Sequence, residues 1–243
     1  PGGALRDDPL SMASDMRKAA LTPDAEATAR ASALIGGGRL VIEGKAGTAK
    51  YVTLDFGMPV HGYPYLRIAD ATPGAAVDFG YCEIPYSLRD GKAHVRTDGW
   101  INTEGVVGPG YGDRYVTASG GQYVELPDER TARWMALHIR FPKDGRVVIE
   151  DTGIVKSQYP VRMIGSFSCG DERVDRIVKL CLIHAEVTMS DAYVDTPGRE
   201  DGQWIEDAQP RALIGACWFG DTSLRRFLIR TFGWMVILNR NGL

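Results

Sequence analysis

Short stretches in which apolar and polar residues alternate follow one another through the middle of the chain. From residue 39 onward, runs rich in β-branched and aromatic residues recur about every ten positions, with Gly, Pro or Asp in nearly every gap. These runs predict strands at 39–43, 51–56, 65–68, 76–81, 94–97, 114–116, 122–126, 134–139 and 146–149. Such short strands separated by turn residues are typical of antiparallel sheets. We therefore expect a β-sandwich domain over residues 39–160.

The apolar residues change to a helical spacing after residue 160. Apolar positions three and four residues apart predict three helices, at 172–190, 207–218 and 223–238. Ser168 or Asp171 is the expected N-cap of the first helix and Asp221 that of the third, because their side chains can accept hydrogen bonds from exposed amides. Pro210 is expected in the first turn of the second helix, where a proline is tolerated. The last third of the chain, 161–243, is therefore predicted to be helical.

The first 38 residues are rich in alanine and polar residues and are expected to form a flank. Within them, Thr22-Pro23-Asp24 predicts the start of a short helix that ends at the glycines 36–38. The sequence begins without Met and without an apolar signal segment, so we expect a processed or engineered start. This leaves the compartment open, with a secreted or periplasmic location favoured over a cytoplasmic one.

Composition and charge narrow the classes of partner. The formal net charge is −3 and the basic residues are scattered, so no nucleic acid is expected to bind. The longest apolar stretches are far shorter than the roughly 20 residues of a membrane helix, so no membrane partner is expected either. No cofactor is expected, because the glycines 36–38 precede a strand instead of a helix and do not form a nucleotide-binding loop.

The cysteines and histidines indicate no metal site. The four cysteines are widely spaced, and Cys181 and Cys217 lie in apolar runs, which favours buried free thiols. The four histidines lack the spacing of metal ligands, and His138, inside a predicted strand, is expected to have a structural role.

One segment between the first two predicted helices concentrates reactive side chains. Residues 195–207, DTPGREDGQWIED, hold five carboxylates, one guanidinium and one indole. Pro197, Gly198 and Gly202 oppose a regular helix, so the segment is expected to be a loop held by its own polar contacts. Carboxylates this close cannot all ionise cheaply, and one raised pKa is what a general acid requires. Arg199 could make paired hydrogen bonds to a carboxylate or a sugar diol, and Trp204 offers a flat face for a sugar ring.

Plainer interpretations of this segment stay open. Charged loop residues are usually only solvated, and Asp207 could simply cap the next helix. A lone tryptophan such as Trp204 is more often part of a core than a platform for a ligand.

The order and spacing of the segment resemble a known signature. Asp, Pro, Arg, acid, Trp and Asp at these offsets resemble the pattern D-C-P-x-R-[DE]-x-x-G-W-x-G-D of glycoside hydrolase family 78, the bacterial α-L-rhamnosidases. The matching residues are Asp195, Pro197, Arg199, Glu200, Trp204 and Asp207. Residues 165–167 resemble the start of that family's catalytic domain, and segments 55–57 and 81–83 resemble its preceding β-sandwich. Thr196, Gln203 and Glu206 depart from the pattern, and Glu206 adds bulk and charge where the family has glycine.

The resemblance implies a fold and a reaction. Residues 161–243 would be the first helices of an (α/α)6 toroid whose cavity holds a terminal L-rhamnose of a glycoside or polysaccharide. Glu200 would be the general acid, and Asp195, Arg199, Trp204 and Asp207 would bind the sugar. Catalysis would be inverting, with a base roughly 6.5–9.5 Å from the acid. The family's base is a Glu expected beyond residue 243, so residues 1–243 alone are expected to be inactive.

The same resemblance leaves partners and alternatives to be tested. The helices would expose apolar faces unless the remainder of the toroid, or a second copy of the chain, covers them. Two other functions stay open: an exo-glycosidase on the same toroid for a different sugar, and a non-catalytic carbohydrate-binding module.

Overall fold

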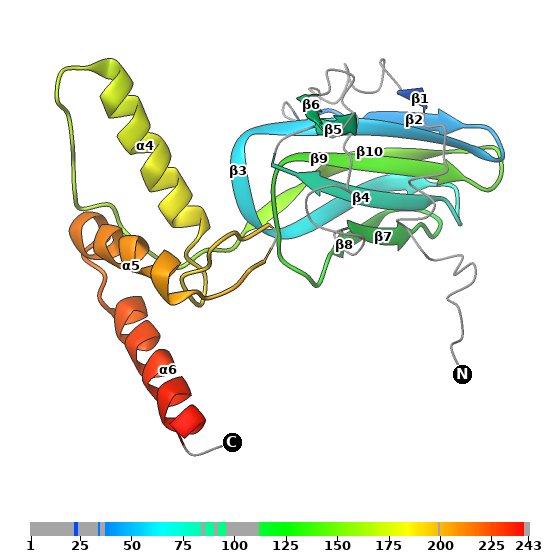
Figure 1. The fold of residues 1–243 in the computed structure, drawn as a ribbon. Helices are drawn as coiled ribbons and strands as arrows, with labels where there is room; N and C mark the ends of the chain where they lie inside the picture. Colours follow the sequence, from blue (N-terminus) through cyan, green and yellow to red (C-terminus); the bar gives the residue numbers. More distant parts are fainter. Residues whose placement is uncertain are drawn as a thin grey trace. The chain divides into compact units, whose positions relative to one another are not determined.

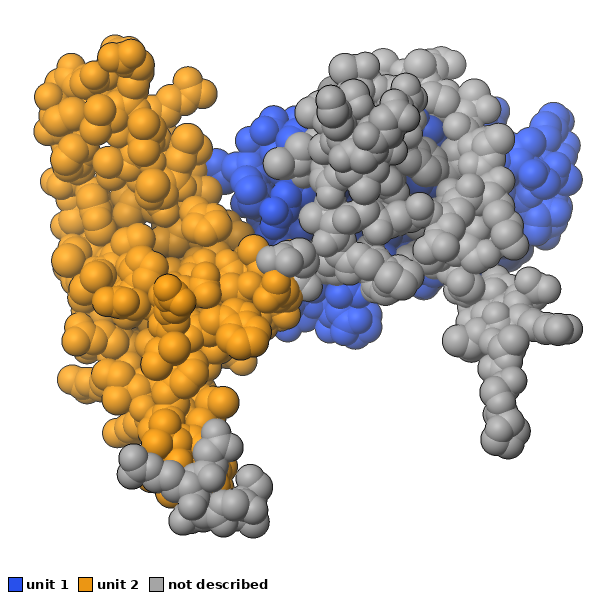
Figure 2. Space-filling model, in the orientation of Figure 1, with its two compact units in different colours: residues 1–155 blue, residues 156–243 orange. Residues whose placement is uncertain are grey.

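A computed structural model describes residues 22–23, 34, 37–83, 86–89, 92–95, 112–198 and 200–240. The chain divides into two compact units, residues 1–155 and residues 156–243 (Figures 1 and 2). Of the elements that the structure describes, the strands lie in the first unit and the helices in the second. The predicted order, a mostly antiparallel β region followed by helices, is confirmed. The predicted domain boundaries at 39–160 and 161–243, and the toroid, stay predictions.

The first unit contains a mostly antiparallel sheet of eight strands. Its path runs β2-β10-β3-β9-β4-β7, with β1 and β8 also paired to β3, and β5 and β6 form a separate hairpin. The strands are β1 Thr22–Pro23, β2 Leu40–Gly44, β3 Thr48–Ala71, β4 Ala76–Cys82, β5 Tyr86–Arg89, β6 Lys92–Val95, β7 Gly112–Val116, β8 Gln122–Glu125, β9 Arg130–Phe141 and β10 Gly145–Lys156. All nine predicted runs coincide at least in part with these strands.

The long strand β3 contains both of the strands that were predicted separately at 51–56 and 65–68. Its first part pairs with β9, and its last part pairs with β8 (Figure 1). Within the part paired with β9 the register shifts between Asp55 and Val60, and the carboxylate of Asp55 accepts a hydrogen bond of 2.7 Å from the amide of Gly57. Gly57 has φ +78°, a conformation that other residues rarely adopt. The Gly and Pro residues of segment 57–64 therefore mark an irregularity within one strand and do not end it.

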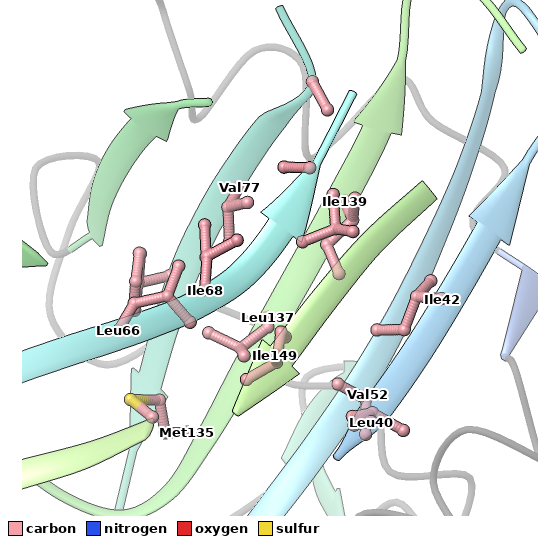
Figure 3. Packing of buried hydrophobic residues seen from close by; sticks show 14 of the residues in the cluster. Leu40, Ile42, Val52, Leu66, Ile68, Val77, Met135, Leu137, Ile139 and Ile149 are labelled. Carbon is pink, nitrogen blue, oxygen red and sulfur yellow. The ribbon is translucent and has the colours of Figure 1, made fainter. Parts of the chain in front are cut away.

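The core of this unit collects side chains from β2, β3, β4, β9 and β10 (Figure 3). The buried residues labelled there are Leu40, Ile42, Val52, Leu66, Ile68, Val77, Met135, Leu137, Ile139 and Ile149. On β3, Leu66 and Ile68 are buried while Arg67 between them is exposed, as strand alternation requires. His138 is also fully buried, and its ring lies 5.6 Å from that of Tyr51.

The second unit contains helices α4 Glu172–Val187, α5 Ile205–Ile214 and α6 Ser223–Arg240. The side chain of Asp171 accepts the amide of Arg173 at 2.9 Å and so caps α4. Asp221 accepts the amides at the start of α6, of Ser223 and Leu224, at 3.2 Å each. Both predicted caps are confirmed. The buried core of this unit consists of Ala185, Met189, Tyr193, Ala208, Ala212, Phe219, Leu224 and Leu228.

Two predictions about backbone structure are wrong. Thr22–Pro23 does not open a helix, because it pairs in parallel with Lys50 and Tyr51 of β3, while residues 24–33 of the predicted helix lie outside the described residues. Helix α5 begins at Ile205, two residues before the predicted start at 207, so Pro210 lies beyond its first turn. The helix then passes into a π-helical turn, Gly215–Phe219, and ends at Gly220 with φ +64°.

The predicted burial of two cysteines is also wrong. Cys181 and Cys217 are free but exposed, because apolar spacing predicts a face that can be buried and does not supply the neighbour that buries it. Apolar side chains are exposed elsewhere in this unit too, including Ile177 of α4 and Trp234 of α6. No helix among the described residues is long and apolar enough to cross a membrane.

Candidate functional site

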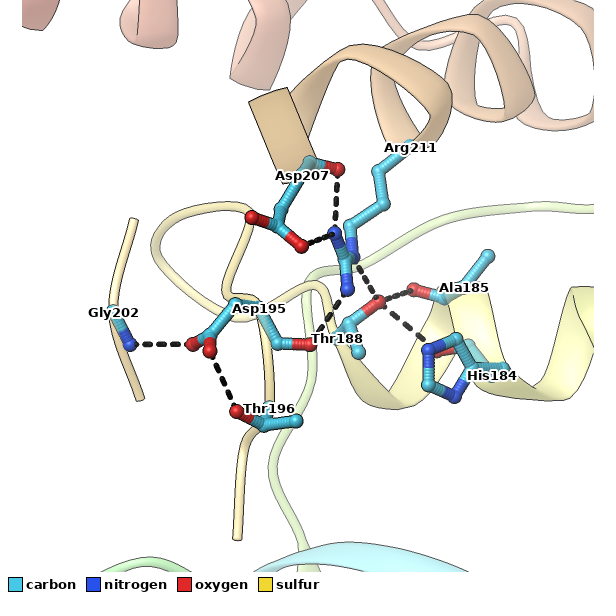
Figure 4. Close-up of polar contacts among 8 residues, drawn as sticks. All are labelled: His184, Ala185, Thr188, Asp195, Thr196, Gly202, Asp207 and Arg211. Atoms are coloured by element: carbon cyan, nitrogen blue, oxygen red, sulfur yellow. Dashed lines mark hydrogen bonds and ion pairs between the residues drawn. The ribbon is translucent and has the colours of Figure 1, made fainter. Parts of the chain in front are cut away.

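The acidic segment forms a loop that its own polar groups close. The amide of Asp195 donates to the carbonyl of Gly202 at 2.9 Å, and the amide of Gly202 donates back to Oδ1 of Asp195 at 2.9 Å (Figure 4). Within this ring, the amide of Asp201 donates to the carbonyl of Thr196 at 3.1 Å, and Asp201 has φ +51°. The prediction of a loop held by its own contacts is confirmed for residues 195–204, because α5 begins at Ile205.

The carboxylate of Asp195 is held in its charged form. Burial would raise its pKa, but hydrogen bonds to the carboxylate outweigh burial, and the pKa is lowered. The donors include the Thr196 hydroxyl at 2.6 Å and the Gly202 amide at 2.9 Å. Asp195 is therefore suited to accept hydrogen bonds from a ligand and unsuited to donate a proton.

Trp204 stands at the N-terminus of α5 with its indole 56% exposed. This exposure argues against the alternative in which Trp204 belongs to the core. A Cβ on Gly202 would lie 2.7 Å from Nε1 of Trp204, so the glycine lets the indole approach the loop closely. The open ring is of the kind that can stack on a sugar.

The other predicted site residues lie on the same loop and the first turn of α5. Glu200 is exposed on the loop. Asp207 does not cap α5 but lies in its first turn beside Glu206, with its side chain 48% exposed. Negative side chains at this end of a helix are stabilised by the helix dipole. Arg199 lies outside the described residues.

Arg211 connects Asp195 with Asp207 and was missed from the sequence. Its Nη2 donates to the carbonyl of Asp195 at 2.6 Å, and its Nη1 donates to the carbonyl of Asp207 at 2.5 Å (Figure 4). The residue is only 8% exposed. Its only signal in the sequence is the four-residue spacing from Asp207, which places the two residues on one face of a helix.

An open groove of about 800 Å³ lies between α4 and α5, next to the loop. Its lining comprises Leu180, Cys181, His184, Ala185, Glu206, Asp207, Pro210, Arg211 and Ile214. Apolar walls with a few carboxylates at one side are suited to a polyhydroxylated ligand. In the part of the chain that the structure describes, no three His, Cys, Asp or Glu side chains gather as metal ligands would.

Comparison with solved structures shows which fold the chain shares. A GH78 family rhamnosidase of Bacillus sp. GL1 matches with a TM-score of 0.65 and 24% identity over 79% of this chain. A rhamnosidase from Klebsiella oxytoca with rhamnose bound matches with 0.54 and 14% over 77%. An α-L-rhamnosidase from Dictyoglomus thermophilum matches with 0.55 and 19% over 71%. This chain spans only 19%, 36% and 18% of the lengths of these three chains.

Comparison with family models adds the domain type. No curated protein matches the chain. The bacterial alpha-L-rhamnosidase six-hairpin glycosidase domain matches residues 162–234, a range that contains the acidic loop and α5. The resemblance to glycoside hydrolase family 78 is therefore confirmed: residues 162–234 match the model of the bacterial α-L-rhamnosidase six-hairpin glycosidase domain, and the fold is similar to that of a GH78 rhamnosidase.

Proposed function

We propose that the acidic loop is the general-acid side of an inverting exo-glycosidase site that removes terminal α-L-rhamnose from glycosides or polysaccharides. The observation that carries the proposal is that Glu200 lies exposed on a loop within the matched glycosidase domain. Its neighbours Asp195, Trp204 and Asp207 are in register with the family signature. The toroid to which these helices would contribute is part of the same proposal.

In this reaction Glu200 donates its proton to the glycosidic oxygen while the bond from that oxygen to the anomeric carbon breaks. A second carboxylate takes a proton from a water molecule, whose oxygen bonds to the anomeric carbon from the opposite face. Asp195 and Asp207 would accept hydrogen bonds from sugar hydroxyls, and Trp204 would stack on the ring. Arg199 would hold a diol with two parallel hydrogen bonds.

The proton donor is tested by Glu200→Gln in the longest form of the protein that carries this sequence. The amide keeps the shape of the side chain but cannot supply the proton, so kcat should fall by roughly 10²–10⁴ on rhamnosides with poor leaving groups. Rhamnosides with a dinitrophenol leaving group need little protonation and should lose much less. Glu172→Gln, at the exposed start of α4, is the matched control and should leave kcat unchanged. Equal losses on both substrates would mean that Glu200 is not the acid.

A different sugar on the same site is the second candidate. Glu206 lines the groove where the family signature has glycine, and a carboxylate there could exclude rhamnose or bind an extra hydroxyl. A panel of aryl glycosides decides between the two sugars. Binding of sugar without turnover of any member, even in the longest form, would instead favour a non-catalytic carbohydrate-binding module.

A further inference from the structure

The guanidinium of Arg211 joins three separate parts of the second unit. Besides the carbonyls of Asp195 and Asp207, it reaches the end of α4, where its Nε donates to Oγ1 of Thr188 at 3.0 Å. All three nitrogens of the guanidinium thus donate to an acceptor, and each acceptor belongs to a different segment (Figure 4). The planar guanidinium holds its donors in a rigid arrangement, so it fixes the three acceptors relative to one another.

The third acceptor is itself firmly held. Thr188 is the C-cap of α4 and is fully buried. Its hydroxyl lies 3.0 Å from the carbonyl of His184 and 3.1 Å from that of Ala185, both in the last turn of the helix. The loop is therefore connected to α4 through a series of buried and part-buried hydrogen bonds, which are stronger than the same bonds in water.

Burial disfavours the charged form of Arg211. Burial lowers the pKa of Arg211, while the nearby carboxylates of Asp207 and Asp195 act in the opposite direction. Its closest carboxylate contact is Oδ1 of Asp207, at 4.0 Å from Nη1. Its short hydrogen bonds are to main-chain carbonyls, so it leaves the carboxylate oxygens of Asp195 and Asp207 available to a ligand.

We propose that Arg211 is the positioning residue of the site. It sets the distance between Asp195 at the start of the loop and Asp207 in α5, and so the separation of two sugar-binding carboxylates on either side of Glu200. This inference rests on the proposed function, since it assigns those carboxylates to one sugar. Although Arg211 lines the groove, we assign it a positioning role and not a sugar contact, because its three nitrogens donate to two main-chain carbonyls and to Thr188.

The test compares Arg211→Lys with the control Arg230→Lys, which changes an exposed arginine of α6. A lysine keeps the charge but cannot serve three acceptors in one plane. Hydrogen exchange at the amides of Asp195 and Gly202, measured by NMR, should become at least tenfold faster in Arg211→Lys and stay unchanged in the control. Because misplacement by about 1 Å can cost about 100-fold, KM for an aryl rhamnoside should rise between about 10- and 100-fold.

The ratio of rates on good and poor leaving groups separates positioning from a merely structural role. Glu200 still supplies the proton in Arg211→Lys, so this ratio should stay as in the parent protein while KM rises. Partial unfolding would instead lower the concentration of active enzyme, which reduces apparent kcat and leaves KM unchanged. That result, or unchanged exchange at Asp195 and Gly202, would overturn the inference.

A milder substitution keeps the test valid if Arg211→Lys does not fold. Thr188→Val preserves the shape of the side chain and, of the three acceptors of Arg211, removes only that of Nε, together with the hydroxyl's own bonds to the carbonyls of His184 and Ala185. It should therefore change exchange and KM in the same direction by a smaller factor. In the double variant the effects of the two substitutions should be non-additive, because they interrupt the same connection. Additive effects would contradict the proposal. If no sugar binds to any variant, the proposed function fails, while the exchange measurement still decides whether Arg211 holds the loop.

Discussion

Strand β4 carries a carboxylate with no solvent exposure, that of Asp78. Arg114 of β7 donates to it twice, from Nε at 2.5 Å and from Nη2 at 2.9 Å, and Arg140 of β9 donates from Nε at 3.1 Å. The side chains of the two arginines are 13% and 23% exposed. Asp78 therefore holds three neighbouring strands together by charge-assisted hydrogen bonds.

Asp78→Asn would leave two positive side chains, largely removed from water, without their common anion. Removal of one partner from a buried ion pair typically costs about 3–5 kcal/mol of the free energy of unfolding. We expect the lower end, about 3 kcal/mol, because the residual exposure of Arg114 and Arg140 lets water reach both guanidinium groups. With a urea m-value of about 2 kcal/mol/M, the midpoint of urea unfolding should fall by about 1.5 M.

The control is Asp70→Asn, because Asp70 forms an exposed pair with Arg146 at 2.8 Å. An exposed pair contributes about 0–1 kcal/mol, so its midpoint should fall by less than about 0.5 M. Both variants are measured by circular dichroism of the sheet during urea titration, and equal m-values are required for the comparison. Equal midpoint shifts in the two variants would refute the argument that burial makes Asp78 important.

Three further predictions follow from the described contacts. Burial lowers the pKa of His138 to about 4, so between about pH 6.5 and pH 4 the unfolded chain binds a proton that the folded chain does not. The free energy of unfolding should therefore fall by up to about 3 kcal/mol as the pH decreases across this window, and urea titrations of His138→Gln should lack this part of the pH dependence. Gly202→Ala should displace the Trp204 indole, seen as altered fluorescence quenching by iodide, with less than about 1 kcal/mol lost in urea unfolding, because an exposed side chain can move; unchanged quenching would contradict the contact. Size exclusion should show that residues 1–243 self-associate through exposed apolar side chains such as Trp234 of α6, and a monomer with rhamnosidase activity would show that the base lies within these residues.

Much of the local structure could be predicted because it depends on neighbours in the sequence. The helix caps Asp171 and Asp221 follow from side chains that accept amides two or three residues away. Glycines and prolines in segment 195–204 forbid a helix wherever the segment lies, so the loop was predictable too. The order of its acidic and aromatic residues also indicated the resemblance to glycoside hydrolase family 78, because fixed offsets along a chain need no tertiary structure to be read.

Tertiary structure decided which of these residues act together. Thr22-Pro23 has the pattern of a helix start, yet it pairs in parallel with Lys50 and Tyr51 of β3, each 28 positions further along the sequence. The apolar spacing around Cys181 predicts a helix correctly but not its burial, since burial depends on whether another element covers that face. Arg211 looked unremarkable in the sequence because its three acceptors lie 4, 16 and 23 positions away. The sequence by itself thus determined the elements and the reactive side chains, and only folding placed Asp195, Asp207 and Thr188 around one buried guanidinium, because such contacts join positions that no local pattern relates.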